Sequence, residues 1–282
     1  MARPSRIPST LAALSAATLL SSAVLAQTTP PAAPAAAPAA AAPAAPEPDW
    51  TFTGNLGLYS QYVFRGVSQT NEKPAVQGGF DLGHKSGFYA GTWGSNISWI
   101  TDATPAASAS MEWDIYGGYK GSLPADFGYD LGVLYYWYPG SYPSGYVLPN
   151  TTELYAALSW KWASLKYSYS VNNKTFGFPD SRGSSYLDLT ANYDVVEKVN
   201  DAIGKVTLTG HVGHQWYTGS TNGYSNSNYE YTDWKLGAST EVYGLTVGVF
   251  YTDTNANNAL YTNPFGRKIA DSQVVGFIQK TF

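Results

Sequence analysis

The sequence contains no cysteine and few charged residues. The absence of cysteine excludes disulfide bonds and thiolate metal sites. Only 13% of the residues are charged, against roughly 25% in ordinary soluble domains. Beyond the N-terminal segment there is no continuous run of about 18 apolar residues, so membrane-spanning helices are not predicted. The stability of such a chain has to come from an extensive hydrogen-bonded sheet.

The first 48 residues divide into two segments. Arg3 and Arg6 precede an apolar run over about residues 11–20, and Ala26 ends a small-residue cleavage site. This pattern predicts a secretory signal peptide over residues 1–26, because the apolar run is too short for a spanning helix. Residues 27–48 are almost wholly Ala and Pro and predict an extended linker. Removing the signal peptide changes the net charge from -4 to -6, which argues against nucleic-acid binding.

The rest of the chain is rich in aromatic residues and alternates between polar and apolar positions. Aromatic residues make up 15% of the sequence, and 23 residues are Tyr. The segment YEYTDWKLGASTEV, residues 229–242, places charged residues on one face and aliphatic residues with Trp234 on the other. That period of two is typical of a β-strand. Twelve such segments are predicted, at about 50–64, 75–85, 87–98, 110–120, 127–138, 151–162, 164–172, 185–193, 205–216, 229–242, 244–253 and 272–282.

The connections between these segments alternate between long and short. Long ones, such as 65–74 and 254–271, are rich in Asn, Ser, Thr, Gly and Pro, and short ones include 85–87 and 243–244. A closed antiparallel up-and-down transmembrane β-barrel over residues 49–282, with periplasmic termini, requires this parity. A soluble Greek-key sandwich does not. The connection 194–204 is of intermediate length and has a short helix as an alternative.

Aromatic residues gather near both ends of the predicted strands, as in the aromatic girdles of a barrel in lipid. One group comprises Trp99, Trp137, Trp216 and Trp234, and the other comprises Trp50, Trp160, Trp162, Tyr119 and Tyr243. The last segment ends in Phe282, with Ile278 and Val274 on the same face. This ending looks like the signal read by the barrel-assembly machinery, although Lys280 departs from the usual pattern.

The segment from Tyr62 to Asn96, YVFRGVSQTNEKPAVQGGFDLGHKSGFYAGTWGSN, resembles the N-terminal part of the TorF family of proteobacterial porin-like proteins. The run FRGVSQT at residues 64–70 and the closing KTF at 280–282 carry most of the likeness, which covers about residues 49–282. The resemblance implies an outer-membrane barrel regarded as a porin, without an established substrate. It supplies no catalytic residues.

Charged residues of the predicted strands belong on the inner face, because Lys or Arg facing mid-bilayer lipid costs about 2–4 kcal/mol. The predicted pore-lining residues are Arg65, Asp81, Glu112, Asp114, Lys120, Asp130, Glu153, Lys161, Lys166, Asp188, Asp233, Lys235 and Glu241. An acid-rich aqueous pore would favour cations. The same charges could instead pair into a network that fills a closed barrel. Arg65 has two interpretations: part of a constriction, or a partner of acids at the rim.

Six tyrosines are predicted on the inner face, where they could form a stacking track for sugars or pack the interior. They are Tyr59, Tyr116, Tyr136, Tyr138, Tyr155 and Tyr186. A lipid hydrolase is an alternative function that would need His214, facing outward like His84, beside Ser239 or Ser159. The segment 253–263 resembles a calcium loop only superficially, since it lacks the terminal Glu.

The prediction is therefore an outer-membrane porin-like channel for small polar or cationic solutes. A non-conducting structural or adhesive barrel remains the alternative, followed by the lipid hydrolase. No cofactor and no catalytic residue is predicted. The expected partners are outer-membrane lipids, the barrel-assembly machinery, small polar solutes and other copies of the chain.

Overall fold

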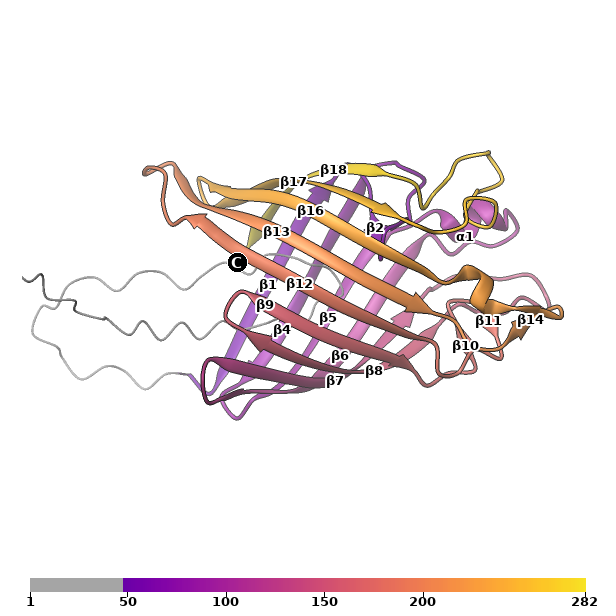
Figure 1. Ribbon diagram of the computed structural model, residues 1–282, viewed down its shortest axis with the longest axis horizontal. Coiled ribbons are helices and arrows are strands. Elements are labelled where there is room, and N and C mark those ends of the chain that lie inside the picture. The colour runs from indigo at the N-terminus through magenta and orange to yellow at the C-terminus, as the bar shows by residue number, and fades with distance from the viewer. Residues whose placement is uncertain (1–47) are drawn as a thin grey trace, which may run out of the picture.

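The computed structural model describes residues 48–282, and these fold into a closed antiparallel β-barrel (Figure 1). The predicted signal peptide, 1–26, and nearly all of the predicted linker, 27–48, lie outside the described residues. The prediction of a twelve-stranded up-and-down barrel is confirmed. The barrel strands are β1 (Trp50–Tyr59), β4 (Ala75–His84), β5 (Phe88–Asn96), β6 (Met111–Leu123), β7 (Phe127–Trp137), β8 (Thr151–Trp160), β9 (Ala163–Ser170), β12 (Ser185–Val196), β13 (Ile203–Trp216), β16 (Tyr231–Val242), β17 (Leu245–Thr254) and β18 (Gln273–Thr281).

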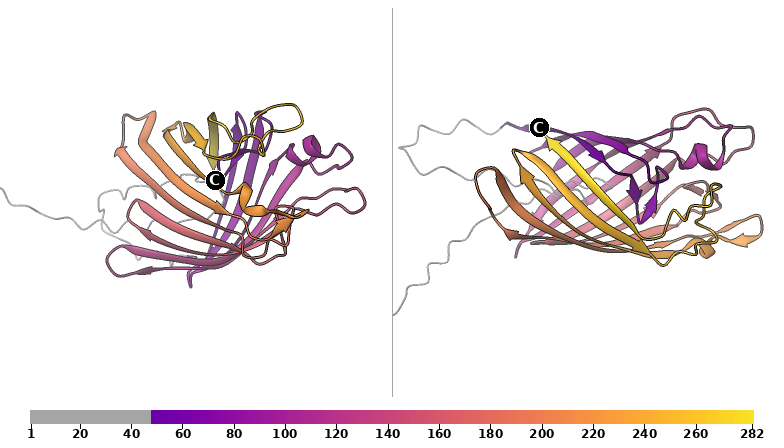
Figure 2. Two further views of the ribbon diagram at one scale, coloured as in Figure 1. Left: turned by 45° about the vertical axis from the view of Figure 1, so that its right-hand side comes forward. Right: turned by 90° about the horizontal axis from the view of Figure 1, so that it is seen from above.

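The barrel closes where the last strand, β18, pairs with the first, β1. The register runs from Asn55 opposite Thr281 to Tyr59 opposite Phe277. Beyond it, the Gly54 N–H donates to the Phe282 carbonyl at 2.7 Å. In every other neighbouring pair, the two barrel strands follow one another along the chain and are antiparallel. The strands cross the barrel axis at a slant (Figure 2). Closure leaves no unpaired sheet edge, which is the condition a sheet must meet in lipid.

The connections sort by length to the two ends of the barrel. Short turns, with the C-terminus, lie at one end, which we call the short-turn end, and the long connections lie at the other, the long-loop end (Figure 1). The helix alternative for residues 194–204 is wrong. β12 and β13 instead extend toward each other, with register shifts at Asp194/Val196 and Ile203/Val206, and bends join them.

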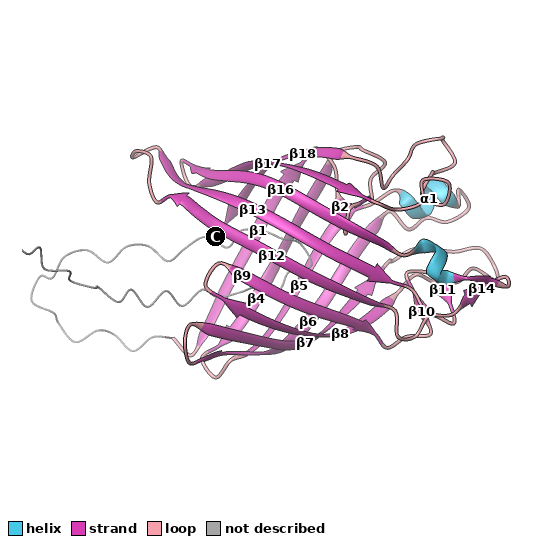
Figure 3. Ribbon diagram, viewed as in Figure 1, coloured by secondary structure: helices cyan, strands magenta, loops and turns pink. Residues whose placement is uncertain are grey.

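The long connections carry the small remaining elements (Figure 3). Among the described residues, no helix is long and apolar enough to cross a membrane. The remaining elements are β2 (Val63–Phe64), β3 (Val67–Ser68), α1 (Trp99–Ala103), β10 (Lys174–Thr175), β11 (Phe178–Pro179), β14 (Ser220–Thr221), β15 (Tyr224–Ser225) and the 3-10 helix η1 (Asn226–Tyr229).

Alternation along the strands gives the barrel an apolar outer face and a polar inner one. Leu236 is 61% exposed and Leu158 is 45% exposed, whereas Asp233 on the inner face of β16 is 2% exposed. The predicted segment 87–98 follows the same alternation, because Trp93 and Ser95 of β5 are both buried inside. The aliphatic side chains of the outer face are therefore not part of a dry two-layer core.

Aromatic rings lie near both ends of the outer face. Trp137, Trp216 and Trp234 are exposed toward the long-loop end, and Trp50 and Trp160 toward the short-turn end. Trp99 was expected in the first group and is not part of it. It begins α1, and its ring packs edge-on against Tyr138 at 5.6 Å between centroids. The Trp99 N–H donates to the Gln69 carbonyl of the connection after β1 at 3.2 Å, so Trp99 belongs to the packed long-loop end and not to the outer face.

Candidate functional site

The connection after β1 folds into the barrel as a hairpin. We call residues 60–74, which contain β2 and β3, the first-loop hairpin. Tyr62 is fully buried, and its hydroxyl donates to Glu112 of β6 at 2.7 Å. Burial and the Glu112 carboxylate raise the pKa of Tyr62 well above its ordinary value. The hairpin base is therefore anchored to the inner wall through a neutral phenol.

The turn of the hairpin reaches the wall at β16 and β17. Arg65 and Gly66 have φ angles of 47° and 78°, the left-handed region that a two-residue hairpin turn requires. A Cβ on Gly66 would lie 2.4 Å from Thr254 Cγ2 and 2.7 Å from Asp233 Cβ. Only glycine allows so close an approach, which explains the Arg-Gly pair at this position.

The guanidinium of Arg65 contacts several strands of the wall. It donates to Glu153 of β8 at 2.8 and 3.0 Å and to the Gln215 side-chain oxygen of β13 at 2.7 Å. It also stacks over the Tyr186 ring of β12, 4.2 Å from the centroid. Burial alone lowers the pKa of Arg65, but the Glu153 carboxylate more than offsets this, so that the pKa is raised well above its ordinary value.

These contacts combine one part of each interpretation of Arg65. Its side chain is only 7% exposed and that of Glu153 only 1%. Arg65 therefore pairs with an acid, as one interpretation expected, but it does so inside the barrel and not at an exposed rim. The hairpin tip lies inside the barrel, where Arg65 contacts Glu153 and Gln215.

Most inner-face carboxylates accept a hydrogen bond from a tyrosine hydroxyl. Tyr89 donates to Asp130 at 2.6 Å and Tyr116 donates to Asp81 at 2.7 Å. Further pairs join Tyr136 with Glu153 at 3.2 Å and Tyr186 with Asp233 at 2.8 Å. A neutral phenol stabilises the ionised carboxylate without cancelling its charge. This arrangement favours interior packing over the sugar-stacking track, because the rings are buried against their acid partners.

A second cluster surrounds His211 on β13, which was not among the predicted pore-lining residues. Its Nε2 lies 2.9 Å from Asp233 and its Nδ1 lies 3.3 Å from Asp188. The Tyr186 hydroxyl lies 3.1 Å from Nε2. His211 is three residues before the outward-facing His214 on the same strand, so strand alternation puts it on the inner face. Its two acid partners could not be found without the strand pairing.

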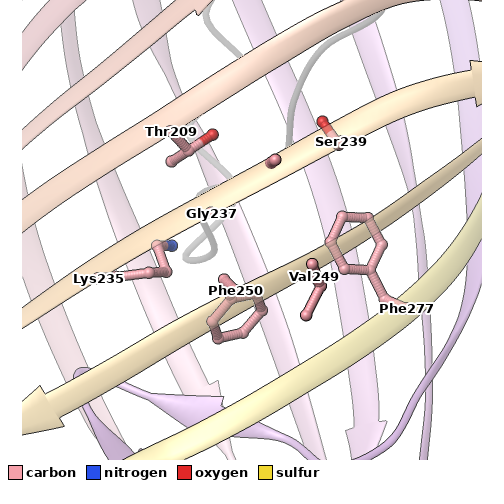
Figure 4. Close-up of a pocket in the computed structure, with 8 residues that line it drawn as sticks. Thr209, Lys235, Gly237, Ser239, Val249, Phe250 and Phe277 are labelled. Atoms are coloured by element: carbon pink, nitrogen blue, oxygen red, sulfur yellow. The ribbon is translucent and has the colours of Figure 1, made fainter.

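Three of the predicted pore-lining lysines lie near aromatic rings. Lys120 lies 5.0 Å from the Tyr89 centroid, and Lys166 lies 4.1 Å from that of Tyr155. Lys235 borders a small recess of about 20 Å³, also lined by Thr209 and Phe250, which has room for about one water molecule (Figure 4). Such contacts stabilise the ammonium groups beside aromatic rings. Carboxylates still outnumber lysine and arginine side chains among the predicted pore-lining residues.

Two of the predicted pore-lining residues lie away from the packed interior. Lys161 was expected on the inner face but sits in the short turn after β8, exposed, with its ammonium 4.7 Å from the Trp160 ring. Its positive φ of 51° belongs to the turn, and the turn removes the residue from the strand alternation. Glu241 lies on β16 near the short-turn end and is half-buried.

Asp114 on β6 is fully buried, and neither of its carboxylate oxygens has a hydrogen-bond partner among the described residues. A buried polar group without a partner costs about 1–3 kcal/mol, and more when charged. We expect Asp114→Asn to raise the free energy of unfolding by ~1–3 kcal/mol. Urea unfolding of the refolded barrel measures this. Glu153→Gln is the control and should lower it by about 3–5 kcal/mol, because it leaves Arg65 buried and unpaired. Equal losses in both variants would contradict the prediction.

The pairings required for a lipid hydrolase are not formed. His214 faces outward, stacks on Trp216 at 4.3 Å between centroids and lies 2.8 Å from the Thr232 hydroxyl. Ser239 and Ser159 lie on the opposite, inner face of their strands. Within residues 48–282 no group of three or more His, Cys, Asp or Glu side chains could hold a metal ion, and this includes the loop 253–263.

A family model described as "Bacterial protein of unknown function (Gcw_chp)" matches residues 41–282. The chain belongs to this family. No curated protein matches the sequence. Similar solved structures include the KdgM porin, with 8% identity, a TM-score of 0.49 and coverage of 82% of this chain and 99% of that one. The COG4313 outer membrane channel from Pseudomonas putida F1 has 14% identity, a TM-score of 0.47 and coverage of 83% and 96%.

Proposed function

We propose that the protein is an outer-membrane channel of the porin type that passes small polar or cationic solutes by diffusion. The observation that carries the proposal is the division of a closed barrel into an apolar outer face and a charged inner face. Only helices and closed barrels satisfy all backbone hydrogen bonds in lipid. The aromatic rings near both ends of the outer face support the same placement.

The charges of the inner face support a preference for cations. Its acids outnumber its bases, and tyrosine hydroxyls bind several of them without neutralising them. Rings of carboxylates favour cations in other channels. The predicted pore-lining residues therefore remain part of this proposal, with Lys161 removed.

A non-conducting structural or adhesive barrel is the second candidate, and one observation favours it. The long-loop half of the interior is packed with two clusters of buried side chains. One is built around Tyr62, Trp93 and Tyr136, and the other around Tyr217 and Tyr231. Both clusters include residues of the first-loop hairpin, so the state of the hairpin distinguishes the two candidates.

The location and assembly of the barrel belong to the same proposal. We place the short-turn end and both termini in the periplasm. Phe282, 64% exposed, completes the closing pair with Gly54, which is consistent with the predicted assembly signal. Lys280 donates to the Gly244 carbonyl at 2.9 Å in the last short turn. Membership of the TorF family and self-association stay predictions.

Conductance in planar bilayers tests the proposal. Refolded protein comprising residues 27–282 should give stepwise currents, and a salt gradient should give a reversal potential of the sign for cation selectivity. Asp81→Asn and Asp130→Asn should move that potential toward zero, because both acids lie on the inner wall. Asp201→Asn is the matched control, since its side chain is fully exposed in a short turn. A correctly inserted barrel without any current would contradict the proposal and favour the second candidate.

A further inference from the structure

The residues that hold Arg65 form a defined site on the inner wall. We call Glu153, Gln215, Tyr136 and Tyr186 the Arg65 site. Glu153 and Gln215 accept hydrogen bonds from opposite ends of the guanidinium. The guanidinium carbon of Arg65 lies 4.2 Å from the ring centroid of Tyr186. It lies 5.7 Å from the ring centroid of Phe176, which is in the β10–β11 connection. Arg65 is the only member of this arrangement that comes from the turn of the first-loop hairpin.

The hydrogen bonds that orient the side chains of the Arg65 site come from the barrel wall. The Gln215 amide nitrogen donates to the carbonyls of Ser185 and Trp216 at 3.1 and 3.0 Å, which turns its oxygen toward the interior. Tyr136 donates to Glu153, and Tyr186 donates to Asp233. All four side chains thus have hydrogen-bond partners on strands of the barrel wall. The site is preorganised for a cation before any cation arrives.

The chemistry of the site selects a planar, delocalised cation. A carboxylate and an amide oxygen offer acceptors to a fork of N–H donors, and the aromatic face stacks on a flat guanidinium. A compact ammonium group matches neither the fork nor the stacking. A free anion would meet the Glu153 carboxylate. Without a cation the buried Glu153 charge would be uncompensated, which is strongly unfavourable.

We propose that the Arg65 site is a binding site for solutes that carry a guanidinium group, and that Arg65 is its resident occupant. The inference rests on the proposed channel function, because the site then lies on the path of the solute. A passing guanidinium exchanges with the Arg65 side chain, and the net charge at Glu153 is unchanged by the exchange.

Local geometry allows the Arg65 side chain to leave while the hairpin stays. The hairpin keeps other anchors, namely the Tyr62 hydrogen bond to Glu112 and the bond from the Ser68 N–H to the Ile269 carbonyl at 2.7 Å. Release of Arg65 therefore breaks side-chain contacts only.

Binding of methylguanidinium chloride to the detergent-solubilised Arg65→Gly variant tests the proposal. Titration calorimetry at constant ionic strength should show saturable binding with a Kd on the order of 1 mM, as expected for a few charge-assisted hydrogen bonds. The wild-type protein should bind at least about tenfold more weakly, because Arg65 occupies the site. The double variant with Glu153→Gln should lose at least about tenfold in affinity. Methylammonium chloride, of equal charge but without a fork, is the control ligand and should bind more weakly than methylguanidinium.

Conductance separates this inference from the channel proposal. In bilayers, millimolar methylguanidinium should lower the conductance of Arg65→Gly, and Glu153→Gln should abolish the effect. If Arg65→Gly conducts but binds no methylguanidinium, the inference is overturned and the channel function stands. Binding without any current supports the site and overturns the channel function. If Arg65→Gly does not refold, Arg65→Asn serves instead, since Asn tolerates the left-handed region, and absence of binding there overturns the inference.

Discussion

Replacing residues 60–74 by Asn-Gly should raise the single-channel conductance several-fold. Tyr59 and Ala75 are paired across β1 and β4, so a two-residue turn can join these strands directly. The replacement removes Phe64, which packs against Tyr136 and Phe176 at 5.7 and 5.6 Å between centroids. It also removes Arg65 from the wall. The interior of the long-loop half then loses hairpin residues that belong to its two buried clusters.

The increase in conductance depends on the position of the removed loop inside the barrel. A matched deletion in the connection after β13 is the control. Residues 221–224 include Tyr224, which is 75% exposed, and Gly223, which has open space around it. Shortening this tip should leave the conductance unchanged. Equal conductance of the wild-type and hairpin-free barrels would show that the first-loop hairpin does not limit the current.

A charge placed on the outer face should destabilise the barrel strongly in lipid. Leu236 lies in the middle of β16 and is 61% exposed on the apolar face. Leu236→Arg should lower the free energy of unfolding by about 2–4 kcal/mol, the cost of placing Arg against mid-bilayer lipid. Urea unfolding of the protein refolded into phospholipid vesicles measures the difference.

The control for Leu236→Arg is an arginine on the inner face. Thr53 of β1 is exposed and alternates with the outward Phe52, so it faces the barrel interior near the short-turn end. Thr53→Arg should change the stability little, because its charge stays in water. A loss of similar size in both variants, or no loss in either, would contradict a lipid-facing outer surface.

The strands and their faces could be predicted from the sequence because they depend on local alternation. Glu112, Asp130 and Asp233 were assigned to the inner face from their position relative to aliphatic neighbours, and the structure places them inside. The alternation fails where a residue leaves the strand. Lys161 in a short turn and Trp99 in a long connection were misplaced for this reason.

The candidate site could be predicted only in part. Arg65 and Glu153 were both named from the sequence, but 88 positions separate them, and nothing local indicates that they pair. Gln215 and His211 were missed because neutral or isolated polar residues look alike on every strand. Their roles come from neighbours across the barrel wall and from the hairpin that passes beside them.

The sequence by itself determined the number of barrel strands, the face of the barrel on which most strand side chains lie and the end of the barrel where the long loops lie. These properties follow from a period of two residues and from turn composition, both of which are local. The tertiary structure alone decided that the first loop turns inward, that Arg65 meets Glu153, Gln215 and Tyr186, and that within residues 48–282 neither carboxylate oxygen of Asp114 has a hydrogen-bond partner. Closing a sheet into a barrel brings together residues that are distant along the chain, and their contacts depend on strand order and register.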